Sequence, residues 1–178
     1  MAPPSAEVAQ QRAAVLAGLP DPPPGFTWVI YRNAAIAKPV GWHERSSPED
    51  FSETKQFLMG YTVQIISHPR ARHGIEPGDA AKMYLTPFIE AHKQKDQVLL
   101  FDQREKDAFQ MIVFRYRDAP PNKTPIIVHK LLVVNPVADS VHAFTFESPE
   151  ATWQENWEKY GTPILSRVAV FPRLPSED

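Results

Sequence analysis

The 178-residue sequence has no cysteine, only seven glycines and no long apolar run. Without cysteine the chain has no disulfide, no thiolate nucleophile and no cysteine-bound zinc or iron–sulfur cluster. No apolar stretch approaches the ~18 residues that predict a membrane span. The 19 basic and 21 acidic residues give a net charge of -2, which removes the electrostatic basis for general nucleic-acid binding. The composition is that of a soluble globular domain.

Short motifs of common catalytic and metal sites are also missing. No serine lies in a G-x-S-x-G pattern, and no glycine-rich phosphate loop is present. The six histidines show no H-E-x-x-H spacing, so we expect no metal and no cofactor. These absences favour a non-catalytic protein over an enzyme, although an enzyme need not carry a short motif.

Proline is abundant, with 19 residues, and marks stiff connections. Ser5 can cap a helix over residues 6–16, and the proline run at 20–25 predicts a semi-rigid linker. We therefore expect an N-terminal arm at 1–24, one compact domain at 25–171 and a tail at 172–178. The N-terminus lacks a signal peptide, which predicts a cytoplasmic protein or a mature exported domain whose leader has been removed. A fragment of a longer chain is a third possibility.

The periodicity of the apolar residues predicts a sheet with helices. The expected strands are 26–33, which 34–40 extends, then 57–67, 97–102, 109–117, 125–134, 141–147 and 164–171. A helix is expected over 80–93, kinked at Pro87, and another over 149–160, ended by Gly161 and Pro163. The polar segment 46–55 is either a capped helical turn or a loop.

The strand at 125–134 is apolar on both faces, which indicates a central strand that is covered twice. The short connections between the strands favour antiparallel neighbours. We therefore predict an α/β domain of the α+β type, with a central, mostly antiparallel sheet sandwiched by helices.

Two turns and a helix start resemble a known fold. The strand from Gly25-Phe-Thr-Trp28 to the turn Gly41-Trp42 is followed by a mid-chain helix and a three-strand meander. Ser148-Pro-Glu-Ala-Thr-Trp153 then begins a helix, and Ile164-Leu-Ser-Arg-Val-Ala-Val170 a last strand. Over about residues 25–171 this order resembles the PsbP-like superfamily, which includes extrinsic photosystem II subunits, Ran-binding nucleotide-release factors and bacterial exported relatives. The resemblance implies a protein that docks on a larger complex or holds a partner.

The candidate binding surface combines basic side chains with one turn tryptophan. Arginine forks bind carboxylates and phosphates bidentately, and tryptophan is a common interface anchor. The candidates lie in the loop 67–78, near the loop 117–125, and at the turn: His68, Arg70, Arg72, His73, Arg115, Arg117 and Trp42. Each also has an ordinary interpretation as a solvated charge or a core aromatic residue.

We expect a non-catalytic accessory module that docks on a protein partner, with no nucleic acid bound and no catalytic residue. The alternative is a small-ligand-binding protein or an enzyme, with a pocket between the sheet and the kinked helix 80–93. Two further groups have ordinary interpretations. Trp153, Trp157 and Tyr160 form a helical stripe that is typical of a core, and His129 and His142 are expected to be buried neighbours across the turn 135–139.

Overall fold

The computed structural model describes residues 5–31, 34–46, 50–56, 59–94 and 96–171. Its helical elements are α1 (Ala6–Ala17), α2 (Pro69–His73), α3 (Pro77–Lys93), the 3-10 turn η1 (Glu150–Thr152), α4 (Trp153–Asn156), the π-helical turn η2 (Trp157–Gly161) and α5 (Thr162–Leu165). Its strands are β1 (Phe26–Tyr31), β2 (Ala34–Pro39), β3 (His43–Ser46), β4 (Asp50–Gln56), β5 (Met59–Ser67), β6 (Val98–Lys106), β7 (Phe109–Asp118), β8 (Ile126–Asn135), β9 (Ser140–Pro149) and β10 (Ala169–Val170).

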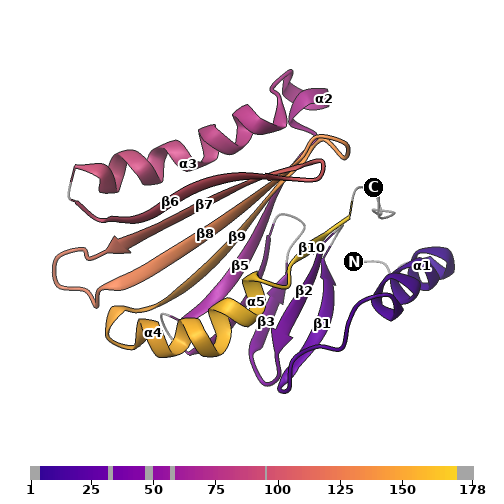
Figure 1. The fold of residues 1–178 in the computed structure, drawn as a ribbon, viewed down its shortest axis with the longest axis horizontal. Coiled ribbons are helices and arrows are strands. Elements are labelled where there is room, and N and C mark those ends of the chain that lie inside the picture. The colour runs from indigo at the N-terminus through magenta and orange to yellow at the C-terminus, as the bar shows by residue number, and fades with distance from the viewer. Residues whose placement is uncertain (1–4, 32–33, 47–49, 57–58, 95, 172–178) are drawn as a thin grey trace.

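The strands form two antiparallel sheets. The larger sheet has seven strands in the order β3-β4-β5-β9-β8-β7-β6, and the smaller has three in the order β1-β2-β10. In Figure 1 the helix α3 runs along one side of the large sheet, and the segment from α4 to α5 runs along the other. The predicted α+β fold with a central antiparallel sheet is confirmed.

Strand β8 is the centre of this arrangement. It pairs with β7 on one side and β9 on the other, and every residue after Ile126 is buried. Its alternating side chains contribute to two separate cores. Val128, Leu132 and Val134 belong to the core under α3, whereas Ile127, Leu131 and Val133 belong to the core under the α4–α5 segment. The prediction of a strand covered on both faces is confirmed.

The helical run after β9 is longer than the sequence suggests. Gly161 and Pro163 were expected to end it, but the chain continues through η2 and α5 to Leu165. Gly161 has helical φ and ψ angles of -60° and -53°, and Pro163 lies in the first turn of α5, where its missing N–H costs no hydrogen bond. A Cβ on Gly161 would clash with the indole ring of Trp157, so glycine here makes room for that ring. Trp153, Trp157 and Tyr160 pack into the core as expected.

Three predictions of local structure are wrong in detail. Residues 34–40 do not extend the first strand, because β2 turns back and pairs with β1. The polar segment 46–55 is neither helical turn nor loop in the part described, because Asp50–Gln56 pairs with β5, and tertiary pairing overrides weak local propensity. The last strand is just Ala169–Val170, because the helical run takes up the residues before it.

Helix α3 starts earlier than expected. Pro77 occupies the first turn, where its missing N–H costs no hydrogen bond, so the helix begins before Asp79. The helix continues through Pro87 to Lys93. At the N-terminus, the predicted cap is present: the backbone N–H of Val8 donates to Oγ of Ser5 at 3.3 Å.

Candidate functional site

The predicted basic loop is internally neutralised. Arg70 forms a two-point ion pair with Glu76, in which Nε and Nη2 lie 2.9 and 2.7 Å from the carboxylate oxygens. The carboxylate of Asp139 accepts the backbone N–H groups of Arg70 and Ala71, both at 3.0 Å, and so caps the short helix α2. His68, Arg72 and His73 are exposed around it. Part of this basic surface therefore stabilises the local turn.

The sheet separates the two predicted loops. Ser67, which precedes the basic loop, pairs with Ser140 of β9, and Ser140 pairs with Asn135 at the end of β8. The loop 117–125 instead connects β7 to β8 at the other end of these strands, where Asp118 pairs with Ile126. Hence the candidates at 68–73 and those at Arg115 and Arg117 do not form one surface.

Trp42 is not the exposed anchor that its place in a turn suggests. Its side chain is 6% exposed and lies with its ring centroid 5.0 Å from that of Tyr160 and 6.3 Å from that of Tyr61. The turn brings Trp42 under the helical run, where an aromatic ring fills the corner between the two sheets. Trp42 is part of the core.

The two strand arginines have different partners. Arg117 makes a fork with Glu150, with Nε–Oε1 at 2.6 Å and Nη2–Oε2 at 2.9 Å. Arg115, two residues earlier and on the same face, lies over two aromatic rings. Its Cζ atom is 4.5 Å from the ring centroid of Trp157 and 5.2 Å from that of Trp153. We call Arg115, His129, Trp153 and Trp157 the arginine shelf.

His129 fixes the orientation of this guanidinium. Nε of Arg115 donates to Nδ1 of His129 at 3.1 Å, and the imidazole ring lies 4.5 Å from the ring of Trp157. Burial, together with the charge of Arg115, lowers the pKa of His129 to about 3. The imidazole is therefore neutral at physiological pH and acts as an acceptor. Burial also lowers the pKa of Arg115.

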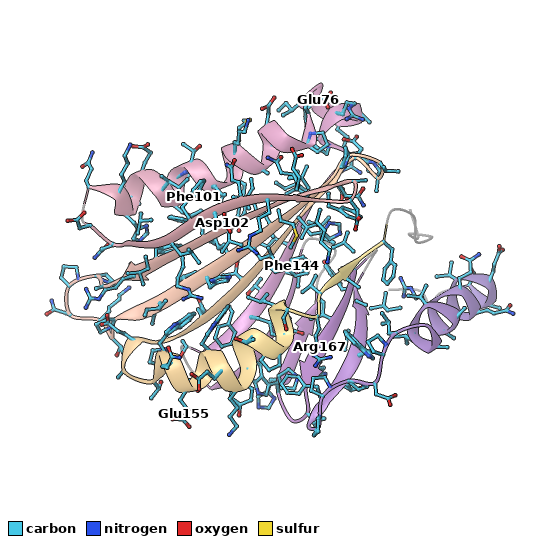
Figure 2. The ribbon with its side chains drawn as sticks, in the orientation of Figure 1. Glu76, Phe101, Asp102, Phe144, Glu155 and Arg167 are labelled. Carbon is cyan, nitrogen blue, oxygen red and sulfur yellow. The ribbon has the colours of Figure 1, made fainter. Side chains whose placement is uncertain are left out.

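A second unusual surface lies on the edge strand β6. Its four consecutive residues Val98, Leu99, Leu100 and Phe101 are between 38% and 50% exposed. The strand pairs with β7 alone, so the backbone groups on its other side have no strand partner within the described part of the sheet. Figure 2 shows Phe101 on this strand beside α3, and Phe144 inside the fold.

A groove adjoins this edge on the side of α3. It has a volume of about 430 Å³ and is lined by Ile89, Lys93, Asp96, Val98, Phe101 and Phe114. The alternating faces of β6 explain it, because Phe101 pairs with Phe114 and both side chains point towards α3. The register shifts between Val98 and Leu100, so this edge carries a bulge within its apolar half.

A polar cluster lies between α3 and the sheet. The buried amine of Lys130 donates to Oη of Tyr84 at 3.2 Å and to Oγ1 of Thr145 at 3.1 Å, and lies 4.2 Å from the ring centroid of Phe88. Tyr84 in turn donates to Gln64 at 2.8 Å. Burial lowers the pKa of Lys130 to about 8 and raises the pKa of Glu147. The hydrogen bonds offset the cost of burying the amine.

The histidines do not converge on a metal site. In the part of the chain that the structure describes, no group of three or more His, Asp or Glu side chains is placed to hold a metal ion. His129 and His142 are both buried, but they are not cross-strand neighbours, because His129 pairs with Phe146 and His142 with Val133. The predicted pairing is wrong, because His129 lies six residues before the Asn135–Ser140 pair that closes the hairpin, whereas His142 lies two residues after it.

Sequence reasoning identified Arg115 but missed its aromatic shelf and the β6 edge. An alternating apolar and polar pattern does not distinguish an edge strand from a central one when both contain apolar residues. The single signal for β6 was its charged second half, Asp102–Lys106, because charges are typical of sheet edges. No described helix is long and apolar enough to cross a membrane.

Comparisons with known proteins decide the fold. No protein-family model matches the sequence, and no curated protein matches it significantly. The solution structure of cyanobacterial PsbP (CyanoP) from Synechocystis is similar over 83% of this chain and 93% of that one, with a TM-score of 0.58 and 12% identity. This chain has the PsbP-like fold. The crystal structure of the Ran-binding protein Mog1p from Saccharomyces cerevisiae is also similar, over 82% and 95% of the two chains, with a TM-score of 0.52 and 11% identity.

The PsbP-like fold accounts for the resemblance seen in the sequence, from the first strand to the tryptophan helix. At such low identity it establishes the architecture and transfers no binding residue. Function must therefore be argued from the surfaces of this chain.

Proposed function

We propose that this PsbP-like protein is an accessory module that docks on a protein partner, and that the partner adds an extended segment to the free edge of β6. The observation that carries the proposal is the run of four exposed apolar residues on an edge strand. Exposed apolar patches mark interaction sites, and an unpaired edge is a template for another strand. That a protein of this fold, Mog1p, is described as Ran-binding supports the general role.

The chemistry of β6 describes the segment that would fit. Backbone hydrogen bonds would supply affinity, and alternate side chains would supply specificity. One face of the segment would place an apolar side chain in the groove beside Phe101, and the opposite face would contact Leu100. The charged half, Asp102–Lys106, would lie along a polar stretch of the same segment.

Charge at the apolar half is expected to weaken docking. Phe101→Lys places an amine in the groove, whereas Met83→Lys adds the same charge at another exposed apolar residue, on α3. We expect a partner recovered with the parent protein, and then purified, to bind Met83→Lys with unchanged affinity. Its affinity for Phe101→Lys is expected to fall at least about tenfold, as for a central interface residue. Isothermal titration calorimetry measures both.

Two outcomes would contradict the proposal. One is equal binding of the purified partner to both variants. The other is a parent protein that forms a dimer in analytical ultracentrifugation while Phe101→Lys is a monomer, because the edge would then pair with a second copy of this chain.

The groove also supports the second candidate, a small-ligand-binding protein with a site between the sheet and α3. About 430 Å³ falls within the range of small-molecule sites, and its lining is mostly apolar with one lysine and one aspartate. A bound ligand raises stability by mass action, so a thermal-shift screen with fatty acids, nucleotides and organic anions distinguishes this function from protein docking.

A further inference from the structure

Arg115 has the features of an anion-binding arginine. Arg70, Arg104 and Arg117 each form an ion pair with a carboxylate. Among the described residues, no carboxylate pairs with Arg115, and the pKa of this guanidinium is lowered by burial without any acidic neighbour to oppose it. A partly buried charge without a counter-ion is costly, so the position of Arg115 requires an explanation.

The arginine shelf holds the guanidinium ready for such a partner. Contact with the rings of Trp153 and Trp157 restricts the position of the guanidinium, and the bond from Nε to His129 restricts its orientation. A neutral imidazole accepts this bond without cancelling the positive charge. Among the described residues, none accepts a hydrogen bond from the four N–H donors of the two Nη groups. These groups form a planar fork of the kind that binds a carboxylate at two points.

On its own face of the sheet, Arg115 has apolar neighbours on one side and stays accessible on the other. Leu100 of β6 lies directly across from Arg115 and is 39% exposed, and Val113, two residues earlier, is half-buried. These apolar side chains reduce the contact with water on one flank, which would strengthen an ion pair formed there. An arginine beside apolar residues is a combination typical of interface centres.

We propose that the arginine shelf is a binding site for a carboxylate of an acidic peptide segment, which the guanidinium of Arg115 receives through its two Nη groups. The site is distinct from the free edge of β6, because Nε of Arg115 bonds to His129 of β8 and its guanidinium lies over the tryptophans of the helical run. The site uses Arg115, one of the two strand arginines predicted from the sequence. Arg117 differs from Arg115 because its guanidinium is paired with Glu150.

The probe is a hexaglutamate peptide, with hexaglutamine as the uncharged peptide of equal length. Binding is followed in the full chain by NMR, through the Nε–H signal of Arg115 and the tryptophan indole signals. Arg115→Gln removes the fork, and Arg104→Gln is the matched control, because Arg104 lies on the same face, loses the same charge and is already paired with Asp102. Arg115→Lys keeps the charge but not the planar fork.

We expect hexaglutamate to bind the parent and Arg104→Gln equally, and Arg115→Gln at least about tenfold more weakly, as befits the loss of charge-assisted hydrogen bonds. Arg115→Lys should fall between them, and Phe101→Lys should bind hexaglutamate like the parent. Equal weakening in Arg104→Gln and Arg115→Gln would overturn the proposal, since net charge alone would then explain binding. Tighter binding of inorganic phosphate than of hexaglutamate would overturn the choice of a carboxylate.

Discussion

Replacement of Phe144 by alanine is expected to lower the free energy of unfolding by about 3–5 kcal/mol, the usual cost of removing a buried phenylalanine ring. Phe144 is fully buried on β9 and pairs with Val63 and Leu131 in the core under the α4–α5 segment. The surrounding strands are held in register on both sides, so they can collapse little into the cavity. Urea unfolding, followed by tryptophan fluorescence, measures the change.

Phe101→Ala is the matched control for this prediction. The same ring is removed from the same sheet, but Phe101 is about half exposed, so we expect a loss below about 1 kcal/mol. A large cost at Phe101 would contradict the account of β6, because its apolar side chains would then maintain the fold. A small cost at Phe144 would contradict the assignment of the core.

His129→Gln is expected to make the protein markedly more resistant to acid. The wild-type imidazole is neutral in the folded state, with its pKa lowered to about 3, whereas it protonates near pH 6.5 in the unfolded chain. The group therefore has no effect on stability above pH 6.5 and destabilises the folded state increasingly as the pH falls towards 3. The slope is about 1.4 kcal/mol per pH unit.

Glutamine keeps an acceptor for Nε of Arg115 but does not titrate, so the variant isolates this one group. We expect urea-unfolding free energies of parent and variant to differ little at pH 7 and by about 3 kcal/mol in favour of the variant at pH 4.5. The groups that face His129, namely Arg115, Trp157 and Phe146, do not titrate in this range. Parallel pH profiles for the two proteins would show that His129 is accessible to protons.

The sequence predicted the architecture because the decisive signals were local. Both faces of β8 are apolar, which predicts a central strand, and the spacing of Trp153, Trp157 and Tyr160 predicts a helix packed by one stripe. By contrast, β4 carries mostly polar residues and becomes a strand through pairing with β5. No local pattern reveals a strand that depends on its neighbour.

The candidate site was predicted in part. Arginine in a strand indicates a cation near the sheet, but whether a carboxylate neutralises it depends on contacts between distant segments, such as Arg117 with Glu150. Trp42 illustrates the same limit, because a turn residue is exposed or buried according to what packs above it. The exposure of the apolar residues of β6 could not be predicted from the sequence, since exposure at a sheet edge depends on strand order.

The central claim, that a partner adds a strand to β6, is tested most directly by amide hydrogen exchange of the free protein and of its complex with the purified partner. In the free protein, we expect the outward-facing amides of residues 98–106 to exchange rapidly, as unpaired edge groups do. In the complex they should exchange at least about tenfold more slowly, while β8 amides stay unchanged. Partner binding with unaltered exchange throughout β6 would contradict the account.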